Sequence, residues 1–443
     1  MDRSLGVPAT RADLKAVPGP RWNPIRSARM LVRDPSALAR TLHQQYGEVA
    51  FVNALGRDVV IAQGPALAEE IVRNRDRAFA NGPVYGYAIG RFFQRGVLLL
   101  DFEEHRDHRR IMQHAFTTER LRGYASELHR VITETVDGFP TGEVEMRSEF
   151  KALTLDVALR VFAGIDLPRT DTERLNRACA DMIAAAGSMV RAPLPGTLWR
   201  RGIRGRATVT EFFRAILPAK RADPGADLFS ALCSAQDPDG AVFTDDEIVD
   251  HMVFMLFAAH DTATIALTSA AYQLAKSSDW QERSRAEAVA APDVLGYGDL
   301  ADLTTLDLVM REAIRLRPPV PALPRATRHD TALGEYFIPA GTFVVVLVEA
   351  NHHMPEVWEN PDEFDPLRFT RDLPHRMAWM PFGGGPHQCL GMNFARLEVL
   401  TTLHHLLRAF EWSVPTDHVM DDRGLTFNAG FTATVRRRSP IRT

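Results

Sequence analysis

The longest regular hydrophobic pattern in the chain begins at Thr244. The letters TDDE at this point match a capping box, in which Thr244 and Glu247 satisfy each other's backbone amides. The stretch that follows, IVDHMVFMLFAAHDTATIALTSAAYQLAKSS (248–278), is apolar on most of its helical faces. A helix that is apolar nearly all round is buried on nearly all sides. The pattern therefore predicts one long, central helix.

Helical patterns dominate elsewhere as well. They cover 101–116, most of 118–290 with a loop at 191–206, 304–319 up to a Pro pair, and 391–412. Period-two patterns are short: 46–63 is typical of a β-hairpin, and 337–350 of a strand pair that turns at a glycine. The fold class predicted is mainly α with a minor β portion.

We expect the whole chain, 1–443, to form one domain, because no repeat or low-complexity linker divides it. Residues 1–28 are rich in Pro and Arg and are expected to be extended. A small β-rich part is expected at about 29–80 and 320–350, and the remainder is expected to be α-rich.

Composition excludes several classes of protein. The apolar fraction of 45% and the charged fraction of 24% are those of a globular protein. A net charge of −4 gives no sign of nucleic acid as a partner. The three cysteines, Cys179, Cys233 and Cys389, form no disulfide or zinc pattern and indicate a reducing compartment. No apolar run near the start predicts a leader or membrane anchor, so we expect a soluble, cytoplasmic protein of bacterial type.

Cys389 lies in FGGGPHQCLG (382–391), a glycine-rich loop placed directly before a helix. Glycines allow positive φ and a close approach of backbone to a flat partner. The positive end of the following helix stabilises a thiolate. This combination favours metal ligation from one face over a buried structural cysteine. A thiol nucleophile would need a base, and only His387 is near in sequence.

Two further patterns carry polar chemistry. Glu312 and Arg315 lie on one helix face at i,i+3, and Arg368 in FDPLRF is a candidate third member of a buried charge cluster. Such a pair alone is weak evidence, since solvated helices have many. In AAHDT (258–262), Thr262 can bond back to the carbonyl of Ala258 and make a polar notch in an apolar helix. The simpler alternative is a self-capping Thr262 with Asp261 at the surface.

Together these motifs resemble the cytochrome P-450 family of haem-thiolate monooxygenases, over about residues 18–435. Phe382, Gly385, His387, Cys389 and Gly391 match the family's F-x-x-G-x-(R/H)-x-C-x-G signature. Glu312 and Arg315 match its E-x-x-R, Arg368 matches the arginine of its P-E-R-F segment, and 258–262 match its (A/G)-G-x-(D/E)-T segment. Ala259 stands where the family usually has Gly, and Leu367 where it usually has Glu.

The resemblance implies a haem b held between the long central helix and the cysteine loop, with Cys389 as the iron ligand. Phe382 would shield the sulfur, and Ala258 and Thr262 would face the haem. His105, Arg109, Arg325 and His387 would bind the propionates. Asp261 and Thr262 would form an acid–alcohol pair that delivers protons for O2 activation.

The expected function is hydroxylation or epoxidation of a hydrophobic small molecule, such as a lipid, sterol, terpenoid or polyketide-like compound. The segments expected to line its pocket are 82–97, 182–198, the helix face near Phe254, 320–323 and 427–431. Because the chain has no flavin or iron–sulfur segment, electrons from NAD(P)H must arrive through a reductase and a ferredoxin or flavodoxin. Arg106 and Arg110 are candidate contacts for such a donor. The alternatives are a peroxide-driven peroxygenase or isomerase and a non-catalytic haem ligand binder; the acid–alcohol pair argues against both.

Overall fold

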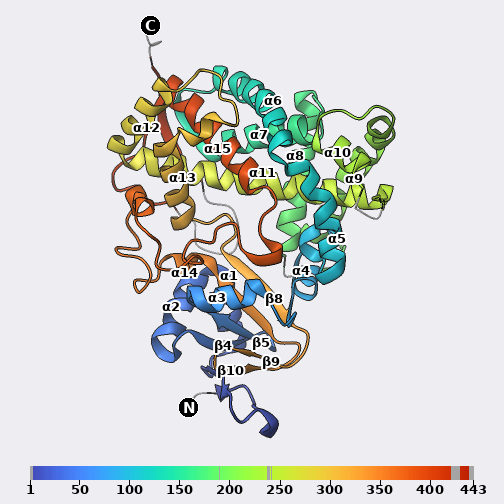
Figure 1. The fold of residues 1–443 in the computed structure, drawn as a ribbon, viewed down its shortest axis with the longest axis vertical. Helices are drawn as coiled ribbons and strands as arrows, with labels where there is room; N and C mark the ends of the chain where they lie inside the picture. The colour runs from blue at the N-terminus through green and yellow to red at the C-terminus, as the bar shows by residue number, and fades with distance from the viewer. Residues whose placement is uncertain (1–2, 189, 237–239, 241, 421–429, 439–443) are drawn as a thin grey trace. The chain divides into compact units, whose positions relative to one another are not determined.

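The structure is a computed structural model that describes residues 3–188, 190–236, 240, 242–420 and 430–438. The chain divides into two compact units (Figure 1). The first contains residues 3–87 and 311–389 of the described chain, and the second contains 88–310, 390–420 and 430–438. Each unit is assembled from separate stretches, so no linker in the sequence marks the division.

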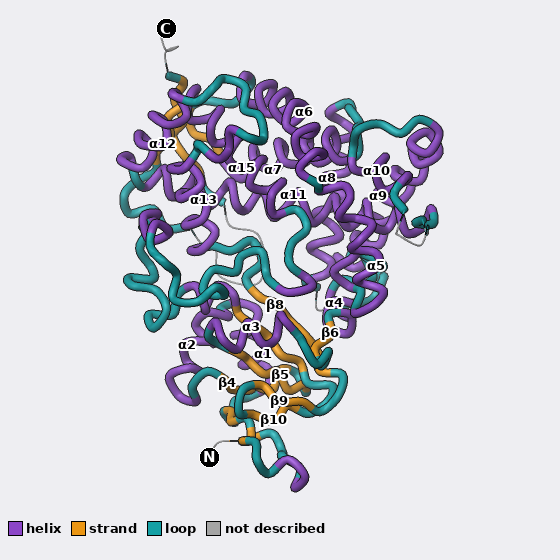
Figure 2. Tube along the Cα trace, viewed as in Figure 1, coloured by secondary structure: helices purple, strands orange, loops and turns teal. Residues whose placement is uncertain are grey.

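The first unit carries most of the strands (Figure 2). Its five-stranded sheet has the order β4-β5-β11-β8-β6. The bounds are Val49–Ala54, Arg57–Ala62, Phe343–Leu347, Ala322–Thr327 and Phe79–Ala80. β4 and β5 form the predicted hairpin, with Val52 opposite Val59.

Alternate residues of this sheet enter two separate hydrophobic cores. Phe51 and Val60 belong to one core, and Val52 and Ile61 to the other. Successive side chains of a strand point to opposite faces, so both faces of the sheet are buried. This explains why the strands have continuous apolar runs.

The segment 337–350 does not form a hairpin with itself, as the sequence had predicted. β10 (Tyr336–Ile338) pairs with β9 (Thr331–Leu333) and β2 (Lys15–Ala16), whereas β11 pairs with β5 and β8. The turn at Gly341, where φ is +75°, therefore carries the chain from one sheet to another. The chain then forms the short helix α14 (Val348–His352).

Helices also interrupt the segments expected to be extended or β-rich. α1 (Pro24–Arg33) begins inside the 1–28 segment, because the Asn23 side chain accepts a bond from the Ile25 amide at 2.8 Å and Pro24 is the first helical residue. Upstream of it lie only short pieces, β1 (Arg3–Ser4), η1 (Ala9–Arg11), β2 and β3 (Pro18–Gly19). α2 (Pro35–Tyr46), α3 (Pro65–Arg73) and α4 (Gly82–Ala88) follow.

The second unit is mostly helical, as predicted. Its helices are α5 (Phe102–Gln113), α6 (Thr118–Asp137), α7 (Met146–Val157), α8 (Arg169–Ala186), α9 (Leu198–Ala222), α10 (Leu228–Ser234), α11 (Asp245–Lys276), α12 (Ser278–Ala290) and α15 (Met392–Ala409). A small sheet joins β7 (Gly142–Glu145), β13 (Thr432–Arg437) and β12 (Phe410–Ser413). α13 (Thr304–Leu316) contributes residues to both units.

The predicted loop at 191–206 is only partly a loop, because α9 already begins at Leu198. Thr197 caps the helix by accepting from the Arg200 amide at 3.3 Å. A Cβ added at Gly205 would lie 2.4 Å from the carbonyl oxygen of Ala178 in α8. The glycines in this segment thus permit close helix packing, although they resemble loop residues in the sequence.

α11 is the predicted long helix. Thr244 caps it, and both bonds of the capping box with Glu247 are present, at 3.3 and 2.9 Å. Its apolar core stretch is long enough to cross a membrane by length and composition, but 72% of that window is buried inside the protein. α11 is therefore the central core helix of the second unit.

Candidate active site

Cys389 is presented by a tight backbone loop in the first unit. Gly383 and Gly385 have φ of +66° and +63°, a region that favours glycine. The Cys389 amide donates to the carbonyl of Phe382 at 3.0 Å, which closes the loop. A Cβ on Gly385 would lie 1.9 Å from the carbonyl oxygen of Val72 in α3, so only glycine allows this approach.

The three cysteines differ sharply in environment. Cys389 is exposed, whereas Cys179 and Cys233 are buried. Burial raises the pKa of the Cys179 thiol to about 12 and that of Cys233 to about 11, because a buried thiolate loses its hydration. Cys389 is therefore the cysteine whose environment suits an external metal group. Among the described residues, no cluster of three or more His, Cys, Asp or Glu side chains could hold a metal ion.

Two of the predicted propionate-binding residues lie in the same unit as Cys389. His387 Nδ1 is 3.0 Å from the side-chain nitrogen of Asn81. Since that amide nitrogen can only donate, Nδ1 accepts and the ring proton of neutral His387 lies on Nε2. Arg325 is buried, donates to the carbonyl of Pro324 at 2.8 Å and lies beside Tyr85. Burial raises the pKa of the Tyr85 hydroxyl, and the Arg325 charge opposes that rise.

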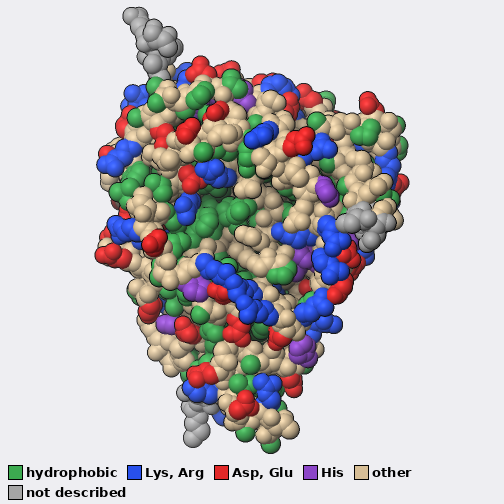
Figure 3. Space-filling model, viewed as in Figure 1, with side chains coloured by type: hydrophobic (Ala, Val, Ile, Leu, Met, Phe, Trp, Pro, Cys, Tyr) green, Lys and Arg blue, Asp and Glu red, His purple; other side chains and the backbone are tan. Residues whose placement is uncertain are grey.

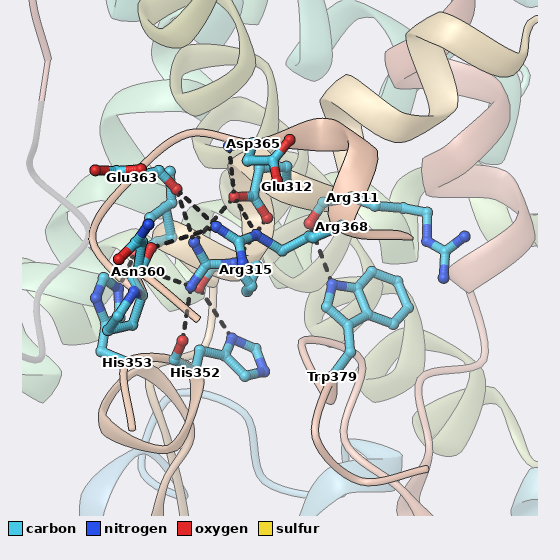
Figure 4. Close-up of polar contacts among 12 residues, drawn as sticks. Arg311, Glu312, Arg315, His352, His353, Asn360, Glu363, Asp365, Arg368 and Trp379 are labelled. Carbon is cyan, nitrogen blue, oxygen red and sulfur yellow. Dashed lines mark hydrogen bonds and ion pairs between the residues drawn. The ribbon is translucent and has the colours of Figure 1, made fainter. Parts of the chain in front are cut away.

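The charge cluster lies in the same unit and is almost completely buried (Figure 4). Glu312 accepts from Arg315 at 2.7 and 2.9 Å and from Arg368 Nε at 2.8 Å. The remaining donors of both arginines go to backbone carbonyls, which include those of His352, Pro361, Glu363 and Glu359. The three predicted residues thus meet in one network that ties α13 to the loop at 359–368.

In the second unit, α11 carries the predicted acid–alcohol pair. Thr262 Oγ1 donates to the Ala258 carbonyl at 2.7 Å, as the sequence predicts. Asp261 is buried rather than at the surface, so the simpler alternative for this segment is wrong. Its Oδ1 lies 3.7 Å from Nζ of Lys151 in α7, a side chain that is only partly exposed.

One face of α11 is left partly exposed within an otherwise buried stretch. Phe257, Ala258, Ala259, Thr262 and Ile265 have intermediate exposure, whereas residues 260, 261, 263 and 264 are buried. The spacing of 258, 262 and 265 places these residues on one side of the helix. The helix therefore offers an apolar surface with the Thr262 hydroxyl within it.

α5 carries the other two predicted propionate-binding residues. His105 is buried and Arg109, four residues later, is partly buried on the same helix face. Arg106 is exposed and forms an ion pair with Asp107 at 3.3 Å. The predicted pocket residues 427–429 lie outside the described residues.

Sequence reasoning missed four polar residues that contact predicted site residues: Asn81, Tyr85, Lys151 and His352. Each comes from an element distant in sequence from its contact. Their spacing therefore carries no local signal. The position of Lys151 became evident only once α7 was seen to pack on α11.

The comparisons place this chain in the cytochrome P450 family, whose model matches residues 17–433. A putative cytochrome P450 136 from Mycobacterium tuberculosis is 40% identical over 92% of this chain and 85% of its own length. Abscisic acid 8'-hydroxylase 2 from Oryza sativa is 28% identical over 86% of this chain and 78% of its own. The retinoic acid-bound cyanobacterial CYP120A1 aligns with a TM-score of 0.80 at 26% identity, over 90% of this chain and 94% of that one.

The chain belongs to the cytochrome P450 family and has its mainly α fold. Membership implies a haem with a cysteine thiolate ligand and monooxygenase activity.

Proposed function

We propose that this protein is a haem-thiolate monooxygenase that hydroxylates or epoxidises a hydrophobic small molecule, with Cys389 as the iron ligand. The observation that carries the proposal is the cysteine loop. Its thiol is exposed, two positive-φ glycines precede it, and close contact with α3 leaves no space for a larger residue at Gly385. Haem, when bound there, supplies the activation of O2 by two electrons.

The residues around Cys389 fit a haem through their charge as well. Propionates need cationic or hydrogen-bonding partners when they are buried. Arg325 is a buried guanidinium, and the Asn81 contact directs the His387 proton to Nε2. His105 and Arg109 on α5 supply the same kinds of donor. We assign these four side chains to the propionates.

We assign proton delivery to Asp261 and Thr262. The Asp261 carboxyl is buried but lies near Lys151 Nζ, which is partly exposed and can exchange protons with water. The Thr262 hydroxyl donates to the Ala258 carbonyl at 2.7 Å, so its oxygen is left to accept a proton or a hydrogen bond. Protons would pass from Asp261 toward Thr262 as oxygen is reduced. A peroxide-driven enzyme or a ligand binder has no need of this pair.

The apolar face of α11 supports a hydrophobic substrate. Phe257, Ala258, Ala259 and Ile265 leave partly exposed carbon surface around Thr262. The names of two relatives, which specify retinoic acid and abscisic acid, are consistent with apolar substrates. Lipids, sterols, terpenoids and polyketide-like molecules all belong to this class.

We assign the electron supply to separate proteins: an NAD(P)H-dependent reductase and a ferredoxin or flavodoxin, in the cytoplasm. The face of the molecule in Figure 3 carries both signs of charge, with Lys and Arg side chains among Asp and Glu. Arg106 is exposed on α5 and is a candidate contact for an acidic donor protein.

The ligand assignment is tested by the reduced, CO-bound absorption spectrum of three cysteine variants. Cys389→Ser removes the proposed thiolate, so the red-shifted Soret band of thiolate haem should be lost. Cys179→Ser and Cys233→Ser change buried thiols of raised pKa, and both should keep the band. Retention of the band in Cys389→Ser would mean that another residue binds the iron. Turnover with peroxide alone, and none with electron-donor proteins, would favour a peroxygenase.

A further inference from the structure

Two side chains join α13 to the segment just before the cysteine loop, and neither has a role in the account so far. The indole nitrogen of Trp379 donates to the carbonyl of Arg311 at 3.1 Å (Figure 4). The amide of Met380 donates to His352 Nε2 at 3.0 Å. His352 Nδ1 is also 3.0 Å from the carbonyl oxygen of Arg315, one helical turn beyond Arg311.

The two bonds of His352 define its protonation. A backbone amide can only donate, so Nε2 carries no proton, and Nδ1 must then donate to the Arg315 carbonyl. Burial lowers the pKa of His352 to about 3, because a charged imidazole would lose its hydration there. The imidazole is therefore a neutral bridge between a helix carbonyl and a loop amide.

The position of the His352 ring is fixed by the buried charge cluster. Its own carbonyl accepts from Arg315 Nη1 at 2.7 Å, and Glu312 holds Arg315 from the other side. His352 is fully buried and Met380 nearly so. The charge cluster, the helix and the histidine thus form one rigid support for residue 380.

The distance along the chain from this support to Cys389 is short in structural terms. The Trp379 ring lies 5.9 Å from the Phe382 ring, centroid to centroid, in an edge-on arrangement. The Gly383 amide donates to the Met380 carbonyl at 3.0 Å, and the Phe382 carbonyl accepts from the Cys389 amide at 3.0 Å. Fixing residues 379 and 380 therefore fixes the carbonyl that holds Cys389.

We propose that His352 and Trp379 are positioning residues that clamp residues 379–382 to α13 and so hold the Cys389 sulfur in ligating geometry. This inference rests on the proposed role of Cys389. It assigns the buried charge cluster a function beyond stability, because the cluster orients His352.

Glutamine and asparagine variants of the holoenzyme separate the two bonds of His352. In His352→Gln the amide oxygen can take the place of Nε2 and still accept from Met380. In His352→Asn only a donor near Nδ1 remains, so the bond to the loop is lost. The readout is the rate at which the red-shifted CO band is lost on mild warming. We expect about a tenfold faster loss in His352→Asn, as one lost hydrogen bond allows, and a nearly unchanged rate in His352→Gln.

Trp379→Phe tests the second contact, because it keeps a ring against Phe382 but removes the N–H donor. The matched control is Trp412→Phe in the second unit, where the indole nitrogen of Trp412 donates to the Ala271 carbonyl at 2.8 Å. Trp379→Phe should lose the CO band several times faster than wild type and shift the haem reduction potential. Trp412→Phe should do neither, even if its melting temperature falls.

The outcomes distinguish this inference from the proposed function. A wild-type protein without the thiolate band would refute the role of Cys389 itself. A wild-type band combined with equal rates of loss in wild type, His352→Asn and Trp379→Phe would refute the clamp alone. If His352→Asn does not fold, Trp379→Phe decides the question, because it removes a single N–H group from a ring that is only partly buried.

Discussion

At the scale of single residues, this chain contains two Glu–Arg pairs with the same i,i+3 spacing and opposite environments. Glu127 and Arg130 on α6 are 2.5 Å apart with side chains 36% and 46% exposed. Glu312 and Arg315 on α13 are 2.7 Å apart with both side chains 0% exposed. An exposed pair gains little because water screens it. A buried carboxylate that holds two guanidiniums leaves uncompensated charge when it is removed.

We therefore expect Glu312→Gln to lower the free energy of unfolding by about 3–5 kcal/mol. Glu127→Gln, the matched control, should lower it by less than about 1 kcal/mol. Thermal unfolding of both holoenzyme variants, followed by circular dichroism, compares them directly. Equal melting temperatures for the two would show that burial of the cluster has no energetic consequence.

Spacing in the sequence located the residues that stand close together in the chain, such as Glu312 and Arg315 or Ala258 and Thr262. It could not locate their partners from other elements. Lys151 beside Asp261 and Asn81 beside His387 are ordinary polar residues in their own helices and loops. Only the packing of one element on another gives them their contacts. Arg368 could be predicted because its segment resembles a family motif.

At the scale of elements, glycines account for both a correct prediction and a wrong one. Those before Cys389 were expected to allow close backbone approach, and Gly385 does contact Val72 at a distance that excludes a Cβ. Gly202 and Gly205 were assigned to a loop, but they lie in α9 where it packs closely on α8. Sequence composition does not distinguish a turn glycine from a packing glycine, since both lack a side chain for different reasons.

Two glycines of the cysteine loop allow strain and crowding to be separated. Gly383 and Gly385 both have positive φ. A Cβ on Gly383 would meet nothing closer than 3.9 Å, whereas one on Gly385 would lie 1.9 Å from the Val72 carbonyl. Gly383→Ala should therefore cost about 1–2 kcal/mol for the backbone conformation alone. Gly385→Ala should also displace the loop and sharply lower the haem content of the purified protein. Equal haem content in both variants would contradict this view of the loop.

At the scale of the whole molecule, buried histidines set the response to acid. Burial lowers the pKa of His251, His352 and His405 to about 3, and of His260 and His404 to about 4. In the unfolded chain these groups bind protons near pH 6.5. Glu398 acts in the opposite sense, since burial raises the pKa of its carboxyl, but it is one group against five.

The histidine contribution to stability is therefore complete above about pH 6.5 and is lost as the pH falls toward 4, because the unfolded chain takes up protons that the folded chain does not bind. We expect the melting temperature to fall steadily between pH 7 and 5. His251→Gln removes one of these groups without touching the cysteine loop, so it should reduce the slope. A melting temperature that stays constant over this range would contradict the prediction.

The central claim, that Cys389 in this fold binds a haem iron as thiolate, is tested most directly by the absorption spectrum of the purified wild-type protein after reduction and exposure to CO. The account predicts the red-shifted Soret band of thiolate-ligated haem, and its loss when Cys389 alone is replaced. A haem-loaded wild-type protein without that band, or a band that survives Cys389→Ser, would contradict the account.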